Sequence, residues 1–229
     1  HVAKIYKEPK KASESVLARR LESSNKIKSD IIISHVRKGS KGGKKYKNTH
    51  PFKKCNYIFA HNGTLNITKE LKYQVKDSKF QPRGDTDSEL IFNYLLMKIK
   101  ERDLKIWKGE DYDWLLEELS NINLYGSLNV LFSDGKHLFA YSDRNQHNHL
   151  SYIKRKAPFG SITLLDVNIR YPNLGYVNLD KEKDPSQFGF IIFTVDRTGK
   201  PTDENWKALK GGNLRIYEKG RLIYSKING

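Results

Sequence analysis

The sequence predicts an α+β protein in which two stacked β-sheets are faced by helices. Three observations indicate this class. Apolar, β-branched segments typical of buried strands occur early, at residues 30–34 and 55–60. Helical periodicity follows between residues 69 and 119, and from Leu124 onward the pattern changes back to strands. No internal repeat or long linker interrupts the 229 residues, so we expect a single domain over residues 1–229.

The N-terminal part combines two predicted strands with one helix. Residues 2–6 alternate between apolar and polar side chains, which predicts a strand, the second arm of a hairpin whose first arm is absent. Apolar residues at helical spacing predict a helix over residues 12–21, with Ser13 as a possible N-cap. Residues 30–34 are too short and too β-branched for a helix, so we expect a strand that continues to Arg37.

The middle of the chain is predicted to contain a loop, a strand and three helices. Residues 38–47 lack the Gly-Lys-Ser/Thr ending and the following helix of a phosphate loop, so we expect a solvated lid. A strand over residues 55–60 ends at the turn signal His61-Asn62-Gly63. Residues 86–88 are natural N-caps for a helix over residues 89–100. Two further helices are expected at residues 69–75 and 113–119.

The C-terminal half is predicted to consist mainly of strands. Asp134-Gly135 is a turn signal between two apolar segments, which predicts a hairpin. A short helical turn is expected at residues 205–209. The expected strands lie at residues 128–132, 137–141, 152–156, 188–195, 213–217 and 222–224, the last two forming a closing hairpin.

Composition limits the functional classes. The 42 Lys and Arg against 26 Asp and Glu give a formal net charge of +16, which points to nucleic acid or another anionic partner. Most of these cations are Lys spread along the chain, so we favour a composition bias over a binding face and keep a basic nucleic-acid-binding protein as the less favoured alternative. No apolar run approaches the roughly 18 residues of a membrane helix. The single cysteine, Cys55, excludes an internal disulfide framework and favours a reducing, cytoplasmic location.

Residues 57–65 carry the sharpest chemical signal. A strand-like run leads into Asn62-Gly63, which places a side-chain amide and a backbone N–H at the open end of a buried strand. Two neutral donors held at such a position suit an anion that forms only during a reaction. The alternative is an ordinary β-turn, which the Asn-Gly pair favours in isolation.

Three further segments place charged and polar side chains at strand ends or at a helix N-terminus. They contain Arg37, then Thr49 and His50, then Asp87. A fixed cation and a fixed anion at one site would suit the zwitterionic head of an α-amino acid. Arg37 could bind its carboxylate in bidentate fashion and Asp87 its ammonium. Taken singly, a residue such as Arg37 is more often part of a surface ion pair, and one such as Asp87 is more often a helix cap.

The four segments together, in this order, resemble the class II glutamine amidotransferases, which are N-terminal-nucleophile hydrolases. The likeness is closest to the compact, stand-alone type and covers nearly the whole chain. The four segments lie at residues 34–37, 48–52, 60–63 and 84–89. The further similar segments lie at residues 128–135, 155–160, 205–206 and 211–224.

The resemblance implies a four-layer αββα sandwich of the N-terminal-nucleophile hydrolase type. It implies that a cysteine at residue one of the mature protein attacks the side-chain amide of glutamine, with its own α-amine as base. Carried over by motif, the Asn62 side-chain amide and the Gly63 backbone N–H would form the oxyanion hole. Arg37 would hold the substrate carboxylate and Asp87 its ammonium. The pocket would also be lined by Thr49 and His50.

The chain departs from the family pattern at its start. The family opens with Met-Cys and a strand, then a Gly-Trp-Gly strand, and none of these is present. We therefore expect that the N-terminal portion of the domain is missing and that residues 1–229 alone are inactive. Cys55 is no substitute, because it has no free α-amine and begins a predicted buried strand. Without the first strands, an apolar face near residues 31–33 and 57–60 should be uncovered.

Other functional interpretations stay open. The same pocket could belong to a non-catalytic module that binds a γ-glutamyl ligand or a partner. An active form could use glutamine, a γ-glutamyl peptide such as glutathione, or a pathway intermediate, since all share the amino-acid head. Transfer of ammonia would require an acceptor or synthase subunit. No cofactor or metal is expected, because His147 and His149 are too sparse for a zinc site.

Overall fold

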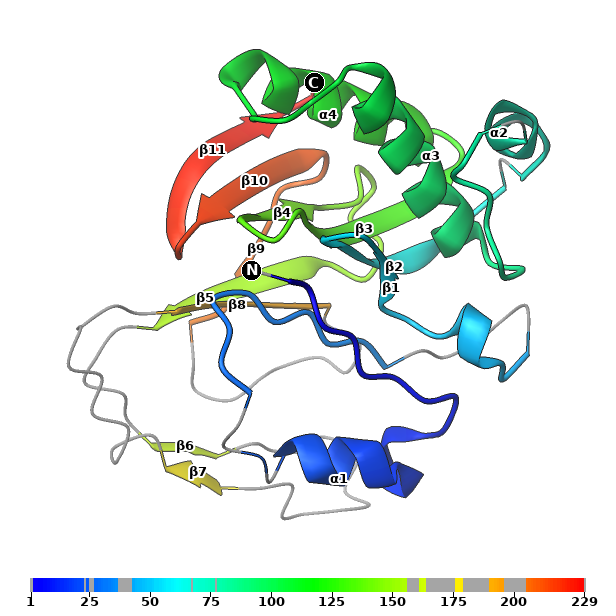
Figure 1. Cartoon of the computed structure of the whole chain (residues 1–229). Coiled ribbons are helices and arrows are strands. Elements are labelled where there is room, and N and C mark those ends of the chain that lie inside the picture. Colours follow the sequence, from blue (N-terminus) through cyan, green and yellow to red (C-terminus); the bar gives the residue numbers. More distant parts are fainter. Residues whose placement is uncertain are drawn as a thin grey trace.

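The computed structural model of the protein (Figure 1) describes most of the chain. The described residues are 2–22, 24, 27–36, 43–66, 68–76, 78–155, 161–163, 176–178, 190–195 and 205–228. The helices are η1 (Ala12–Glu14), α1 (Val16–Glu22), η2 (Tyr46–Asn48), α2 (Thr68–Val75), α3 (Asp87–Glu101) and α4 (Gly109–Asn123). The strands are β1 (Phe52–Lys54), β2 (Tyr57–Leu65), β3 (Gly126–Ser133), β4 (His137–Tyr141), β5 (Leu150–Arg155), β6 (Ser161–Thr163), β7 (Tyr176–Asn178), β8 (Phe190–Val195), β9 (Lys207–Ala208), β10 (Asn213–Glu218) and β11 (Arg221–Ile227).

Two antiparallel sheets are stacked between helical layers (Figure 1). The larger sheet has the strand order β1-β2-β3-β4-β10-β11. Helices α3 and α4 lie over one of its faces. The smaller sheet, β8-β5-β9, lies over the other face, with α1 beyond it. The layers are therefore helix, sheet, sheet and helix, and the predicted αββα sandwich is confirmed.

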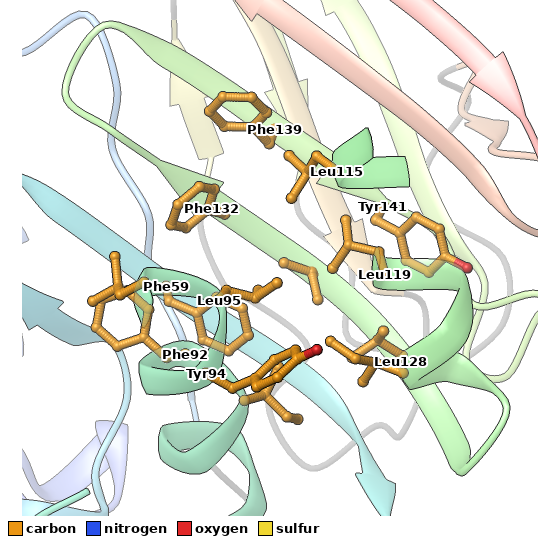
Figure 2. Close-up of a cluster of buried hydrophobic side chains, with 14 of the residues drawn as sticks. Phe59, Phe92, Tyr94, Leu95, Leu115, Leu119, Leu128, Phe132, Phe139 and Tyr141 are labelled. Atoms are coloured by element: carbon orange, nitrogen blue, oxygen red, sulfur yellow. The ribbon is translucent and has the colours of Figure 1, made fainter. Parts of the chain in front are cut away.

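The main core lies between the larger sheet and helices α3 and α4 (Figure 2). Phe59 of β2, Phe92 of α3 and Phe132 of β3 are each 2% exposed or less. Their ring centroids are 5.4 to 6.5 Å apart. Burying one such ring stabilises the fold by about 1.5–3 kcal/mol. This cluster therefore fixes β2 against α3, and with them the polar residues at their adjoining ends.

The predictions for the central and C-terminal elements are largely confirmed. Helices α2 and α3, the β3–β4 hairpin, β5, β8 and the closing β10–β11 hairpin all occur where the periodicity places them. Helix α4 is longer than predicted and begins at Gly109. Within the described ranges, no helix combines the length and apolarity needed to cross a bilayer.

The two predicted N-terminal strands are wrong. Residues 2–6 and 30–34 belong to no strand and join no ladder in the part of the chain that the structure describes. An extended segment becomes a strand only when another strand receives its backbone hydrogen bonds, which composition alone cannot supply. Ile32 is 69% exposed, as expected for an uncovered apolar face near residues 31–33.

Two helical predictions also need correction. The helix predicted over residues 12–21 is divided into η1 and α1, because Ser15 rather than Ser13 accepts the Ala18 N–H at 2.8 Å. Residues 205–209 contain no helical turn but the short strand β9, which pairs with β5.

Cys55 is not at the start of a buried strand. It is exposed, with φ 53°, in the turn that joins β1 to β2. The strand begins two residues later, at Tyr57.

The uncovered apolar face is only partly confirmed. Phe59 and Ala60 are buried, with 0% and 5% exposure. A cavity of about 1250 Å³ is lined by Ile31, Ile33 and Ile58 together with residues of the N-terminal segment. The accessible apolar surface thus belongs mainly to the segment that precedes β1.

Candidate active site

The Asn62-Gly63 pair lies inside strand β2 and not in a turn. Asn62 is paired with Asn129 of β3, and Gly63 with Leu128. Gly63 has φ 151°, and a Cβ there would lie 2.0 Å from the backbone oxygen of Ser127. The turn prediction was wrong. Glycine is needed here because the backbones of β2 and β3 approach too closely to leave room for a side chain. The predicted donor pair nevertheless remains at one place on the strand.

The backbone N–H of Gly63 points to the edge of β2 away from β3. The neighbouring Thr64 N–H donates to Ser127 Oγ on β3 at 3.0 Å. Successive N–H groups of a strand point to opposite edges, so the Gly63 N–H faces the other way. Strand β1 pairs with β2 only from Tyr57 to Phe59, so in the described residues no strand pairs with this part of the edge.

The side chain of Asn62 supplies the second donor. Side chains alternate between the two faces of a strand, so Asn62 points away from α3, toward the smaller sheet. Its Oδ1 accepts a hydrogen bond from Asn148 Nδ2 at 3.1 Å. The Nδ2 end of the Asn62 amide is therefore directed away from Asn148. A neutral amide donor and a backbone N–H thus come from consecutive residues.

Asp87 lies beside this donor pair. It is the first residue of α3, and its Oδ2 accepts the Leu65 N–H at 2.9 Å. Leu65 and Gly63 are two residues apart, so their N–H groups face the same edge of β2. The helix is capped by Thr86, whose side chain accepts the Glu89 N–H. Asp87 is therefore not the N-cap, and its half-buried carboxylate adjoins the candidate hole.

His50 is placed near β2 through another histidine. Its buried ring stacks on His35 with centroids 4.1 Å apart, and His35 Nε2 lies 3.2 Å from the carbonyl oxygen of His61 on β2. Thr49 is half-buried, and its hydroxyl donates to the Lys45 carbonyl at 2.9 Å. Thr49 and His50 therefore lie in the loop leading to β1. His50 reaches β2 only indirectly, through the His35 ring that it stacks on.

Arg37, the predicted carboxylate ligand, lies outside the described residues. Of the predicted site residues, the structure brings Asn62, Gly63 and Asp87 together. It places His50 near them through His35.

His61, which the sequence did not single out, connects three elements of the site. Its Nδ1 lies 2.9 Å from Ser88 Oγ of α3, and its Nε2 lies 3.1 Å from the Ser127 carbonyl oxygen of β3. A carbonyl can only accept, so Nε2 carries the proton and Nδ1 accepts from the serine hydroxyl. The contacts fit a neutral imidazole, and burial lowers the pKa of His61.

The buried His61 predicts a loss of stability in acid. Because its pKa is lower in the folded state, the unfolded chain binds more protons as pH falls below about 6.5. This contribution is fully present above that pH and decreases by at most about 1.4 kcal/mol per pH unit below it. We expect the difference in unfolding free energy between wild type and His61→Gln, measured in urea, to shrink from pH 8 to pH 5. A constant difference would contradict a neutral buried His61.

Asn148 and Asp143 are the other residues that the sequence reasoning missed. Asn148 was considered only as part of the His147-Asn148-His149 segment and its metal-binding capacity. Within the described ranges, no group of His, Cys, Asp and Glu is arranged to hold a metal ion. A usable signal was the density of Asp and Asn after β4, which is typical of loops folded by side chain-to-backbone hydrogen bonds.

Comparisons with known proteins identify the family of the chain. Residues 1–228 match the family described as "Glutamine amidotransferases class-II". An uncharacterized protein of Methanocaldococcus jannaschii is 40% identical over 226 residues, which cover 97% of this chain and 59% of that protein. The Escherichia coli K12 protein named "Putative glutamine amidotransferase YafJ" is 29% identical over 96% of this chain and 82% of that protein.

A solved structure is also similar. It is described as a "predicted glutamine amidotransferase from Pseudomonas aeruginosa PA01" and has a TM-score of 0.56 at 26% identity. The likeness covers 78% of this chain and 66% of that one. The chain thus spans less than two thirds of the length of both the archaeal relative and this structure.

Proposed function

Because this chain belongs to the class II glutamine amidotransferase family, we propose that it carries the oxyanion hole and substrate-binding residues of a γ-glutamyl amide hydrolase. The observation that supports this most directly is the donor pair on β2. The Asn62 amide is held by its oxygen, and the Gly63 N–H lies on the strand edge that β1 does not reach, beside the Asp87 carboxylate.

In the proposed reaction, a cysteine thiolate attacks the carbonyl carbon of the substrate side-chain amide. The carbonyl oxygen becomes an anion that accepts hydrogen bonds from Asn62 Nδ2 and the Gly63 N–H. The tetrahedral intermediate collapses to a thioester as the amide nitrogen takes the former thiol proton from the cysteine α-ammonium group and leaves, as ammonia from glutamine or as an amine from a γ-glutamyl peptide. Water then hydrolyses the thioester, which releases glutamate and restores the thiol.

The spacing of the site residues fits an amino-acid head. Two residues of a strand span about 6.5 Å, so the N–H of Leu65, bound by Asp87, lies about that far from the N–H of Gly63. This is comparable to the length of an extended glutamine from its side-chain amide to its α-nitrogen. Asp87 would pair with the substrate ammonium, and Arg37 would bind the carboxylate. Thr49 and His50 would close the pocket.

We further propose that the nucleophilic cysteine lies outside residues 1–229. The one cysteine of the sequence, Cys55, precedes Tyr57, and Tyr57 is about 16 Å along β2 from Asn62. A thiol at that distance cannot reach a carbonyl held by Asn62 and Gly63. Residues 1–229 alone should therefore release no glutamate, and any transfer of ammonia would use a separate acceptor subunit.

Release of glutamate by the full-length protein tests this function. The panel consists of glutamine, glutathione and other γ-glutamyl amides, with Asn62→Ala as the control of strongly reduced activity. We expect glutamate from at least one substrate, and loss of the activity when the nucleophilic cysteine is replaced by serine. Ligand binding without turnover, in a full-length chain that has no N-terminal cysteine, would instead identify a γ-glutamyl-binding module.

A further inference from the structure

The loop between β4 and β5, residues 142–149, contacts the Asn62 amide directly. Asn148 Nδ2 donates to Asn62 Oδ1 at 3.1 Å. A side-chain amide has one acceptor end and one donor end, so engaging the acceptor end fixes the direction of the donor end. If the amide were turned over, its oxygen would face the developing oxyanion and repel it.

We propose that Asn148 is a positioning residue that holds the Nδ2 group of Asn62 toward the oxyanion, an inference that rests on the proposed function. Asn148 itself would touch neither substrate nor nucleophile. Its effect on the reaction would pass entirely through the orientation of Asn62.

The loop that carries Asn148 is held by a buried carboxylate. Asp143 is fully buried, and its Oδ1 accepts the Leu128 N–H at 2.9 Å and Asn123 Nδ2 at 2.6 Å. Its Oδ2 accepts the N–H groups of Asn145 and His147 at 3.0 and 2.9 Å. Four donors on one carboxylate tie the loop to α4 and β3, so its backbone has little freedom next to β2.

Asn129 fixes the same loop relative to Asn62. It is the residue directly opposite Asn62 in the β2–β3 ladder. Its Oδ1 accepts the Asp143 N–H at 3.0 Å, and its Nδ2 donates to the His147 carbonyl at 2.6 Å. The residue before Asn148 is thus bonded to the strand neighbour of Asn62. This leaves the Asn148 side chain within reach of the Asn62 amide.

The backbone at Asn148 restricts which residues can serve there. Its φ is 52°, a left-handed conformation that asparagine, aspartate and glycine adopt more readily than other residues. Glycine therefore removes the donor without backbone strain. Aspartate keeps the size and the backbone preference but offers only acceptors at neutral pH.

Steady-state kinetics of the full-length protein test the proposal with three variants. Asn148→Gly should lower kcat about 3- to 10-fold, because Asn62 loses one orienting hydrogen bond. Asn148→Asp should lower kcat about 10²–10³-fold, because the carboxylate accepts from Asn62 Nδ2 and turns the amide over. Asn145→Asp is exposed in the same loop and should stay within about twofold of wild type. KM should change little in all three, since the hole acts on the transition state.

A second measurement separates this proposal from the function on which it rests. The side-chain amide NMR signals of Asn62, assigned by their loss in Asn62→Ala, should shift in Asn148→Asp and stay in place in Asn145→Asp. Unchanged Asn62 signals in Asn148→Asp would overturn the proposal, as would a kcat no lower than that of Asn148→Gly. Absence of glutamate release by wild type would refute the proposed function, while the NMR signals would still decide the orientation.

Discussion

Replacing Asn62 by alanine is expected to lower kcat for glutamate release about 10²–10³-fold, the usual cost of one oxyanion-hole donor. KM should stay close to the wild-type value, because the hydrogen bond strengthens only as negative charge develops on the carbonyl oxygen. The fold should tolerate the change. Asn62 is only half-buried. Leaving Asn148 Nδ2 without its acceptor lowers the free energy of unfolding by about 1–3 kcal/mol at most.

Asn66→Ala is the matched control for this prediction. Asn66 is exposed just beyond β2 and bonds the Tyr125 carbonyl through its backbone N–H, which the substitution leaves in place. Equal losses of kcat in Asn62→Ala and Asn66→Ala would show that the effect is general to this end of the strand. A raised KM with unchanged kcat would move Asn62 from the oxyanion hole to ground-state binding of the substrate.

The sequence placed Asn62 and Gly63 together at a candidate donor site, but it predicted the wrong local structure for them. An Asn-Gly pair after an apolar run is a short-range turn signal, and short-range signals are all that a single sequence offers at that point. The structure instead continues β2 for two more residues, to Leu65, because β3 pairs with it as far as Gly126. Pairing with the distant strand β3 thus outweighs the local preference of Asn-Gly for a turn. Asn62 and Gly63 still lie next to each other on the strand.

The same distinction explains which other elements were predicted. The β3–β4 hairpin and α3 each close on themselves through contacts nearby in sequence, and both were found. Residues 30–34 have the composition of a strand, yet strand formation depends on a distant partner, and in the described residues they join no ladder. Strand composition succeeded for β5 and β8, which pair with each other far apart in the sequence, and failed for residues 30–34, so composition alone does not decide whether a distant partner is present.

The contacts that complete the site are non-local in the same way. Asn148 and Asn62 are 86 residues apart, and Asp143 binds Asn123, 20 residues before it. Neither pair shares a motif or a periodic face, so no pattern in one sequence joins them. The four ordered segments gave the candidate site residues through their resemblance to the family, whereas the loop next to Asn62 could be found only from the fold.

Replacing Gly63 by alanine is expected to cause the largest loss of stability among these substitutions. The added Cβ would lie 2.0 Å from the Ser127 backbone oxygen, 2.6 Å from its carbonyl carbon and 2.7 Å from His61 Nε2. Backbone atoms of a paired strand cannot move aside without separating β2 from β3. Strain at φ 151° adds to the clash, so we expect a loss of about 2–5 kcal/mol, or roughly 5–15 °C in Tm by differential scanning calorimetry.

Gly109→Ala is the control that isolates the clash. Gly109 is the first residue of α4, and a Cβ there would meet no other atom within 4 Å, so its Tm should equal or exceed that of wild type. If Gly63 lay in an exposed turn instead, its replacement by alanine would lower the free energy of unfolding by only about 1–2 kcal/mol, through backbone strain alone. A Tm of Gly63→Ala within about 3 °C of wild type would therefore favour the turn over the ladder. A larger loss, with kcat reduced even where the protein is folded, would place the oxyanion donors on a strand held rigidly by β3.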